Sequence, residues 1–154
     1  MKKILILLYF PILLSAQWVE LSPTTNYTVI SSGPSEGYDR PRVIVTANNY
    51  PFILWSKLSS PKSIRARKWN GTTFGNVVDV VGSDLMPTGF IGPEIAAKGD
   101  TVYLIFESLL NNNHIIYLKK SFDGGLTFSD TIRVSENSNT HKFAMPNVAV
   151  CEDG

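Results

Sequence analysis

A repeat slightly longer than 50 residues is the feature that most limits the folds open to this chain. Pro41, Pro93 and Pro146 are 52 and 53 residues apart, and each begins a short apolar run typical of a β-strand. Further apolar runs follow in the first two units, which predicts four short strands over about residues 41–81 and again over 93–134. A third unit is expected to begin with a strand at Pro146. Since such a small sheet cannot bury both faces alone, consecutive units must stack.

The runs between these prolines predict where the individual strands lie. Turn signals separate the first two strands of each unit, Asn48-Asn49 in one and Gly99-Asp100 in the other. After the N-terminal region, no segment of useful length has the period of an α-helix. The chain is therefore expected to be all-β, as blades of a β-propeller or alternatively as a β-sandwich, which needs no repeat of this length. The expected strands are 41–47, 51–56, 64–69 and 77–81, then 93–97, 102–107, 114–120 and 131–134.

The octapeptide SFDGGLTF, at residues 121–128, lies between the third and fourth expected strands of the second unit. Gly124 and Gly125 permit the positive φ angles that a tight turn requires. The carboxylate of Asp123 can accept hydrogen bonds from backbone N–H groups just ahead of it. Phe128 then supplies an apolar anchor. The sequence predicts a hairpin whose turn is fixed by its own side chains.

The order Ser-x-Asp-x-Gly-x-Thr-Phe resembles the Asp-box, the turn of the BNR repeat in β-propellers of the sialidase superfamily. A degenerate copy, NGTTF at residues 70–74, lies 54 residues earlier and has Trp69 at the position of the aspartate. The resemblance covers roughly residues 27–154 and implies four-stranded antiparallel blades. It also implies that the motif braces a hairpin and takes no part in chemistry. The bracing residues would be Ser121, Asp123, Gly125, Thr127 and Phe128.

A propeller has about four to eight blades, and this chain is expected to supply two complete blades and the first strand of a third. Residues 27–30 precede Pro41 by the distance that separates each fourth strand from the next proline. They are therefore expected to be an outer strand that closes the ring. Residues 18–154 are interpreted as an N-terminal fragment of a longer propeller.

The resemblance also directs attention to Arg40. In the sialidase superfamily, the first strand of the first blade carries an Arg-Ile-Pro motif, whose arginine binds the carboxylate of the substrate. A guanidinium suits this task because its planar fork matches a carboxylate. This chain has Arg40 directly before Pro41, without the spacer residue. Arg40 is therefore a candidate ligand for an anionic sugar, or alternatively a rim arginine paired with Asp39 or Glu36.

Candidates for a catalytic acid are few. The family uses an aspartate in the first or second blade as acid and base, and a Tyr–Glu pair from later blades. Between Arg40 and Val78 there is no Asp or Glu, although a proton donor must reach the leaving oxygen. Asp79 falls inside an expected strand, which leaves Asp84 and Glu94 as the candidates. Solvated loop carboxylates are the alternative.

Residues 1–17 have the pattern of a secretory signal peptide: two lysines, an apolar core at 4–14 and small residues at Ser15-Ala16. The apolar run is too short for a comfortable membrane span, so export without a membrane anchor is expected, to the periplasm, the cell surface or the medium. Without this segment the chain has 12 basic and 13 acidic residues and lacks the basic stripe typical of nucleic-acid binding. The single cysteine, Cys151, leaves no partner for an internal disulfide.

No cofactor is expected. Neither His114 nor His141 has a second histidine or a cysteine at metal-ligand spacing, so no metal site is predicted. Two functions remain open. The first is a non-catalytic exported propeller that binds a glycan or a protein, or serves as a scaffold. The second is the N-terminal part of a secreted exo-α-sialidase-type glycoside hydrolase.

Overall fold

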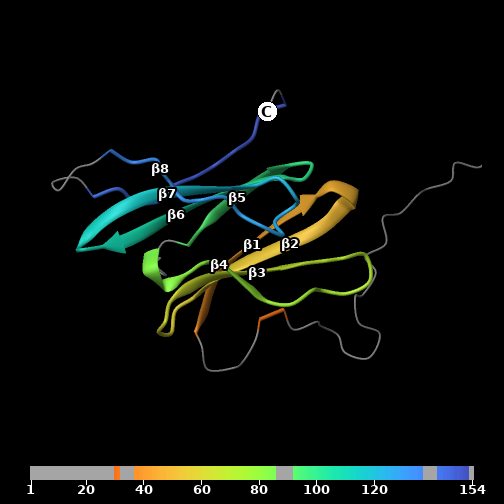
Figure 1. Cartoon of the computed structure of the whole chain (residues 1–154), viewed down its shortest axis with the longest axis horizontal. Coiled ribbons are helices and arrows are strands. Elements are labelled where there is room, and N and C mark those ends of the chain that lie inside the picture. Colours follow the sequence, from red (N-terminus) through yellow and green to blue (C-terminus); the bar gives the residue numbers. More distant parts are fainter. Residues whose placement is uncertain (1–29, 32–36, 86–91, 137–141, 153–154) are drawn as a thin grey trace, which may run out of the picture.

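Two four-stranded antiparallel sheets, each formed in chain order, make up this all-β chain (Figure 1). The computed structural model describes residues 30–31, 37–85, 92–136 and 142–152. The first sheet holds β1 (Tyr38–Thr46), β2 (Tyr50–Lys57), β3 (Ser63–Lys68) and β4 (Val78–Val81). The second holds β5 (Glu94–Lys98), β6 (Thr101–Leu110), β7 (Asn113–Ser121) and β8 (Ile132–Arg133), and two short 3-10 turns are η1 (Ala47–Asn49) and η2 (Ser83–Leu85).

These eight strands confirm the expected all-β class and the four strands of each of the first two units. The strand expected from Pro146 is wrong: residues 142–150 are described but form no strand. A strand needs a neighbour that accepts and donates its backbone hydrogen bonds, and no described strand pairs with these residues. The predicted signal segment at 1–17 and the closing strand at 27–30, apart from Ile30, lie outside the described residues. Among the described helices, none is long and apolar enough to cross a membrane.

The turns between the first two strands of each sheet use the residue types that the sequence indicated. Asn48 and Asn49 adopt φ angles of 63° and 58°, in the left-handed region that Asn tolerates better than most residues. Gly99 has a φ of 58° in the corresponding turn of the second sheet. The two turns touch, because the backbone N–H of Ala47 donates to the carbonyl of Gly99 over 3.2 Å.

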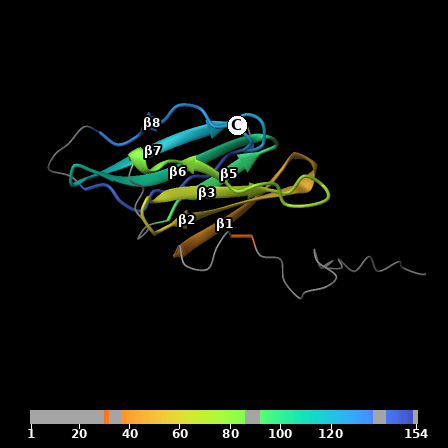
Figure 2. The same ribbon diagram turned by 60° about the horizontal axis from the view of Figure 1, so that its bottom comes forward.

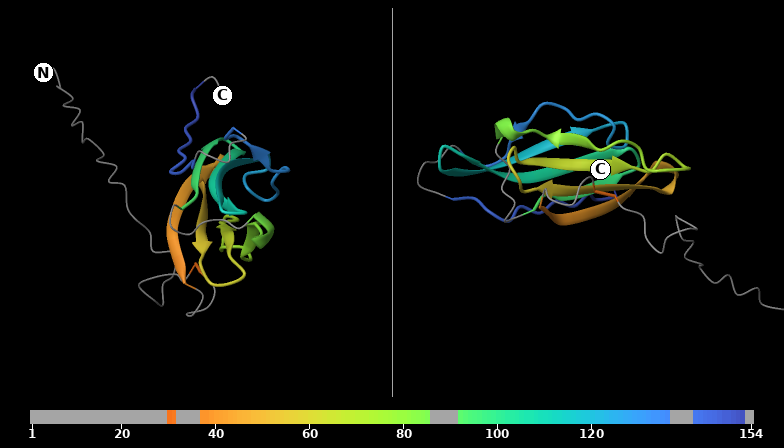
Figure 3. Two further views of the ribbon diagram at one scale, coloured as in Figure 1. Left: turned by 90° about the vertical axis from the view of Figure 1, so that its left-hand side faces the viewer. Right: turned by 90° about the horizontal axis from the view of Figure 1, so that it is seen from below.

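The core lies between the two sheets, which stack face to face (Figures 2 and 3). Alternate residues of a strand point to opposite faces, so Phe52 and Leu54 of β2 reach the same core as Leu104 and Phe106 of β6. The opposite face of β1 exposes Val43 and Val45, whose relative exposures are 64% and 56%. The buried members of the core are Phe52, Leu54, Ile64, Ala66, Val80, Val81, Leu104 and Phe106.

β1 and β5, the first strands of the two sheets, lie close together. Arg42, in the middle of β1, contacts Glu94, the first residue of β5, and the turns that follow the two strands meet at Ala47 and Gly99. The two strands therefore run in the same direction. This arrangement gives the molecule two ends. One carries the starts of β1 and β5, and the other carries the turns, including residues 121–128.

Candidate functional site

An arginine–glutamate pair joins the two sheets, from the middle of β1 to the first residue of β5. The Nε of Arg42 donates to Oε1 of Glu94 over 2.9 Å, and Nη2 contacts the same oxygen. The Arg42 and Glu94 side chains have relative exposures of 35% and 26%. The hydrogen bond to Glu94 raises the pKa of the Arg42 guanidinium, and the partial burial that lowers it is the smaller effect. Glu94, predicted as a possible acid, is therefore held as the partner of a cation.

Arg40 lies beside this pair. It is exposed and adopts a φ of 55°, where β1 departs from regular pairing between Asp39 and Arg42. Its side chain lies against Gly92, since a Cβ added at Gly92 would be 2.7 Å from Cγ of Arg40 and 3.0 Å from Cδ. The absence of a side chain at position 92 thus creates the space that Arg40 occupies.

A cavity of about 270 Å³, here called the arginine cavity, brings Arg40, Arg42 and Glu94 together. Its wall is completed by Gly92 and by a segment of the C-terminal region, Met145 to Asn147. Among the described lining residues, two guanidinium groups and one carboxylate give an excess of positive charge. Such a lining suits an anionic group, particularly a carboxylate, which an arginine can bind through two parallel hydrogen bonds.

The other carboxylates considered in the sequence lie elsewhere. Asp84 is exposed in η2 and does not line the arginine cavity. Asp79 lies in β4, as expected, and its Oδ1 accepts hydrogen bonds from Ser63 at 2.8 Å and from Nε of Arg65 at 2.9 Å. Asp79 therefore fixes the pairing of β3 and β4. The alternative partners of Arg40 named from the sequence are Glu36 and the Asp39 side chain, both outside what the structure describes.

The turn at residues 121–128 is fixed by its own side chains. Oδ1 of Asp123 accepts hydrogen bonds from the backbone N–H groups of Leu126 and Thr127, each at 2.9 Å. Its Oδ2 accepts the hydroxyl of Thr127 at 2.6 Å. The hydroxyl of Ser121 donates to Asp123 at 2.7 Å and accepts the N–H of Gly125 at 2.8 Å. The turn thus satisfies its own backbone donors, which a loop of this shape could not otherwise do.

These hydrogen bonds also determine the charge state of Asp123. Burial raises the pKa of its carboxyl, but the hydrogen bonds from Thr127, Ser121 and Leu126 together outweigh burial and lower the pKa to about 2. A carboxylate this acidic remains ionised at any ordinary pH and is a poor proton donor. The chemistry of Asp123 is therefore that of a structural acceptor.

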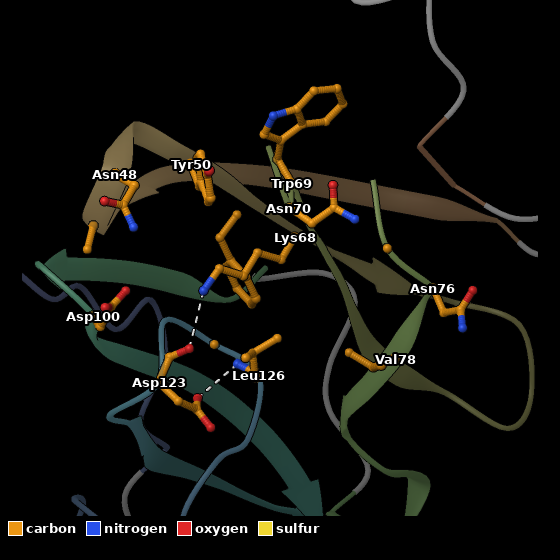
Figure 4. Close-up of a pocket in the computed structure, with 14 residues that line it drawn as sticks. Asn48, Tyr50, Lys68, Trp69, Asn70, Asn76, Val78, Asp100, Asp123 and Leu126 are labelled. Carbon is orange, nitrogen blue, oxygen red and sulfur yellow. Dashed lines mark hydrogen bonds between the residues drawn. The ribbon is translucent and has the colours of Figure 1, made fainter. Parts of the chain in front are cut away.

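The same turn is docked on the first sheet. Nζ of Lys68, on β3, donates to the backbone carbonyl of Asp123 over 3.2 Å (Figure 4). The N–H of Gly124 donates to the carbonyl of Asp100 over 2.8 Å. The rings of Phe52 and Phe128 lie 6.2 Å apart and pack across the gap between the sheets. The turn therefore holds the two sheets together in addition to closing its own hairpin.

The degenerate copy at residues 70–74 forms a comparable turn with a different acceptor. Oδ1 of Asn70 accepts the backbone N–H groups of Thr72 and Thr73, each at 2.9 Å. Trp69, which the sequence aligned with the aspartate, instead forms an isolated bridge with Phe74, and their rings meet edge to face at 5.1 Å. In this copy a side-chain oxygen still accepts the backbone hydrogen bonds, but it belongs to Asn70, one residue later than the alignment predicted.

The sequence interpretation missed two residues of interest. Arg42, and not Arg40, makes the ion pair with Glu94. Glu107, on β6, is 1% exposed, and its Oε1 contacts Nδ1 of His114. Its Oε2 has no hydrogen-bond partner within the described parts of the chain. The only signal in the sequence was a carboxylate inside the apolar run VYLIFESLL.

Within the described residues, no three His, Cys, Asp or Glu side chains gather in a way that could hold a metal ion. No protein-family model and no curated protein matches this chain. The arginine cavity and the turn at 121–128 are thus characterised by their geometry alone.

Proposed function

We propose that the two sheets are neighbouring blades of an exported, sialidase-like β-propeller that binds an anionic sugar in the arginine cavity without hydrolysing it. The observation that carries the binding function is the convergence of Arg40 and Arg42 on one cavity of about 270 Å³. Export rests on the signal-like pattern of residues 1–17. In related forms of this proposal, the cavity binds an exposed carboxylate of a protein ligand, or the propeller serves as a scaffold.

The connection pattern supports blades over a sandwich. Each sheet is a meander of four consecutive strands, whereas the strands of immunoglobulin-like sandwiches are shared between sheets by Greek-key connections. The first strands of both sheets lie side by side with the same direction. Stacking of a further sheet would also cover Val43 and Val45 on the open face of β1.

Two hydrogen bonds place further segments of the chain against the two sheets, as expected if more blades stack on either side. Asn147 lies at the arginine cavity beside Glu94, and the carbonyl of Glu152 accepts a hydrogen bond from Lys98. The C-terminal segment therefore follows β5 from one end to the other, as β5 follows β1. On the other side, Nη1 of Arg67 donates to the carbonyl of Ile30 over 3.0 Å, which brings the chain before β1 against the first sheet.

Binding is favoured over catalysis because of the groups around Arg40. Glu94 is the only carboxylate among the described residues of the arginine cavity, and it is engaged with Arg42. A general acid must reach the leaving oxygen, and the Oε1 atom of Glu94 already contacts both Nε and Nη2 of Arg42. The alternative, a sialidase-type hydrolase, is supported by one observation: Glu94 faces the same cavity as Arg40.

Calorimetric titration of the full chain with 3′-sialyllactose tests the proposal. The anionic trisaccharide should bind, and lactose, which lacks the carboxylate, should not. Arg40→Ala should weaken binding by about tenfold or more, since a charged hydrogen-bonded contact is lost. Arg133→Ala removes an exposed arginine on β8 and is the matched control.

Equal affinities of the wild type and Arg40→Ala would refute the anionic site. Release of a fluorophore from a sialoside by the wild type, abolished in Glu94→Gln, would instead establish the hydrolase alternative.

A further inference from the structure

A second cavity, of about 430 Å³, lies at the opposite end of the molecule from Arg40. Figure 4 shows the residues that line it. We call it the turn cavity. Four connections surround it: η1 after β1, the turn at Asp100 between β5 and β6, the loop between β3 and β4, and the turn that contains Asp123. Its volume falls in the range of about 300–1,000 Å³ that is typical of small-molecule sites. None of the functional candidates taken from the sequence belongs to this cavity except the turn residues themselves.

Part of the lining is apolar. Phe52 is 1% exposed, whereas Val78 and Leu126 are 43% and 66% exposed although both are aliphatic. In Figure 4 the side chain of Leu126 lies near Lys68, Val78 lies farther away beside Asn76, and the indole of Trp69 points away from Asp123. The apolar part of the lining therefore combines aliphatic side chains with the aromatic residues Phe52, Tyr50 and Trp69.

The polar part of the lining consists mainly of groups that can both donate and accept hydrogen bonds. Asn48 and Asn76 are exposed at the cavity, and their amides offer N–H donors and a carbonyl acceptor. Lys68 uses one N–H on the carbonyl of Asp123 and has further N–H groups to offer. Asp100 contributes an acceptor.

The described lining carries one cation and two carboxylates. Lys68 and Asp100 offset one another, and the remaining carboxylate, Asp123, is hydrogen-bonded to Thr127 and Leu126 within its own turn. The lining therefore has no excess of positive charge, and an anionic ligand would gain little here. A ligand that presents C–H groups on one side and hydroxyls on the other would match both parts of the lining.

We propose that the turn cavity binds a neutral saccharide, with its C–H face on Val78 and Leu126 and its hydroxyls on Asn48, Asn76 and Lys68. Hydroxyls donate and accept at once, as carboxamides do, so the two sets of groups are complementary. The site is built only from described residues and is separate from the arginine cavity. It does not depend on the proposed binding of an anionic sugar.

The experiment is a titration of the uniformly ¹⁵N-labelled full chain, followed by amide chemical shifts. The probes are neutral trisaccharides of glucose, galactose or N-acetylglucosamine, with trialanine as a neutral peptide of similar size. At least one trisaccharide should bind with a dissociation constant of about 1 mM or tighter. The shifts should concentrate at Gly75, Asn76 and Leu126.

Two variants and their controls make the result specific. Val78→Trp should fill the cavity and weaken binding by about tenfold or more, because a strand position accepts the larger ring. Val134→Trp, at another exposed valine, should leave affinity unchanged. Asn76→Ala should weaken binding, whereas Asn147→Ala, at the arginine cavity, should not. Well-dispersed spectra of the unliganded variants verify that each one folds.

The inference fails if none of the trisaccharides shifts these amides, or if the shifts concentrate near Arg40. It also fails if Val78→Trp binds as tightly as the wild type, or if trialanine binds at the turn cavity more tightly than every trisaccharide.

Discussion

Phe52 on β2 packs directly on Gly125, in the turn of the second sheet. A Cβ added at Gly125 would lie 2.7 Å from Cδ2 of Phe52, and Gly125 has a φ of 88°. Both the conformation and the space therefore require glycine. Gly125→Ala should destabilise the chain by about 3 kcal/mol, the sum of backbone strain and overpacking. Urea unfolding followed by circular dichroism measures the loss.

Gly99→Ala is the matched control. Gly99 also has a positive φ, of 58°, but a Cβ there meets nothing within 4 Å. This variant should lose only about 1 kcal/mol, from strain alone. Equal losses in the two variants would contradict the packing argument. Phe52→Leu should cost less in the Gly125→Ala background than in the wild type, since a smaller side chain makes room for the methyl group.

The acidity of Asp123 predicts a pH dependence of stability. Its pKa falls from 3.8 to about 2 in the folded chain, so the folded state binds the proton less tightly than the unfolded state. The stabilisation is complete above about pH 4 and is lost as the pH falls through about 2. Since the side chain is partly solvated, its size should be on the order of 1 kcal/mol.

Asp123→Asn tests this dependence by unfolding at pH 6 and pH 2. The variant should be less stable at pH 6, and the difference should shrink towards pH 2. Asp130→Asn removes an exposed carboxylate two residues after Phe128, outside the hydrogen bonds of the turn, and is measured in parallel as the control. A constant difference across this range would show that the carboxylate charge of Asp123 does not stabilise the turn.

The pair Arg42–Glu94 predicts a coupling between the two sheets. A double-mutant cycle with Arg42→Ala and Glu94→Ala should give about 0.5–1 kcal/mol, because both side chains are partly exposed. The coupling should fall in 1 M salt. Arg42→Ala should also shift amide resonances on β5, whereas Arg65→Ala should shift only those of the first sheet. A coupling energy of zero at low salt would show that the Arg42–Glu94 pair does not help to hold the two sheets together.

The hydrogen bonds of Asn70 predict that the turn at residues 70–74 depends on this side-chain acceptor. Asn70→Ala should cost about 1 kcal/mol, since the N–H groups of Thr72 and Thr73 lose their partner. Asn70→Asp keeps the acceptor and should retain most of the stability. Asn76→Ala is the control. If Asn70→Ala and Asn76→Ala unfold at the same urea concentration, the turn is held by other contacts.

Local pattern was enough to predict the strands of both sheets, because apolar runs between turn signals describe a sheet with one buried face. The turn at residues 121–128 was predictable for the same reason: its hydrogen bonds connect residues within four positions of one another. The strand expected at Pro146 failed because pairing depends on a neighbour that the local sequence does not specify.

The joint between the sheets could not be predicted from local pattern. Arg42 and Glu94 are 52 positions apart, and only the stacking of β1 beside β5 brings them together. Asn70 was missed because matching of glycine, threonine and phenylalanine placed Trp69 on the aspartate. In the folded turn the acceptor serves N–H groups two and three residues ahead, and not three and four as Asp123 does.

The turn at residues 121–128 packs on Phe52 and Lys68 of the first sheet, and this contact limits how one repeat could be replaced by another. A cassette cut at the prolines would carry the turn at residues 121–128 but leave behind its receiving surface on the previous unit. A chimera that exchanges the second unit should therefore retain an aromatic residue at position 52 and a lysine at position 68 in its host. The natural boundary for recombination runs through the first sheet, between β1 and β2, and not between the sheets.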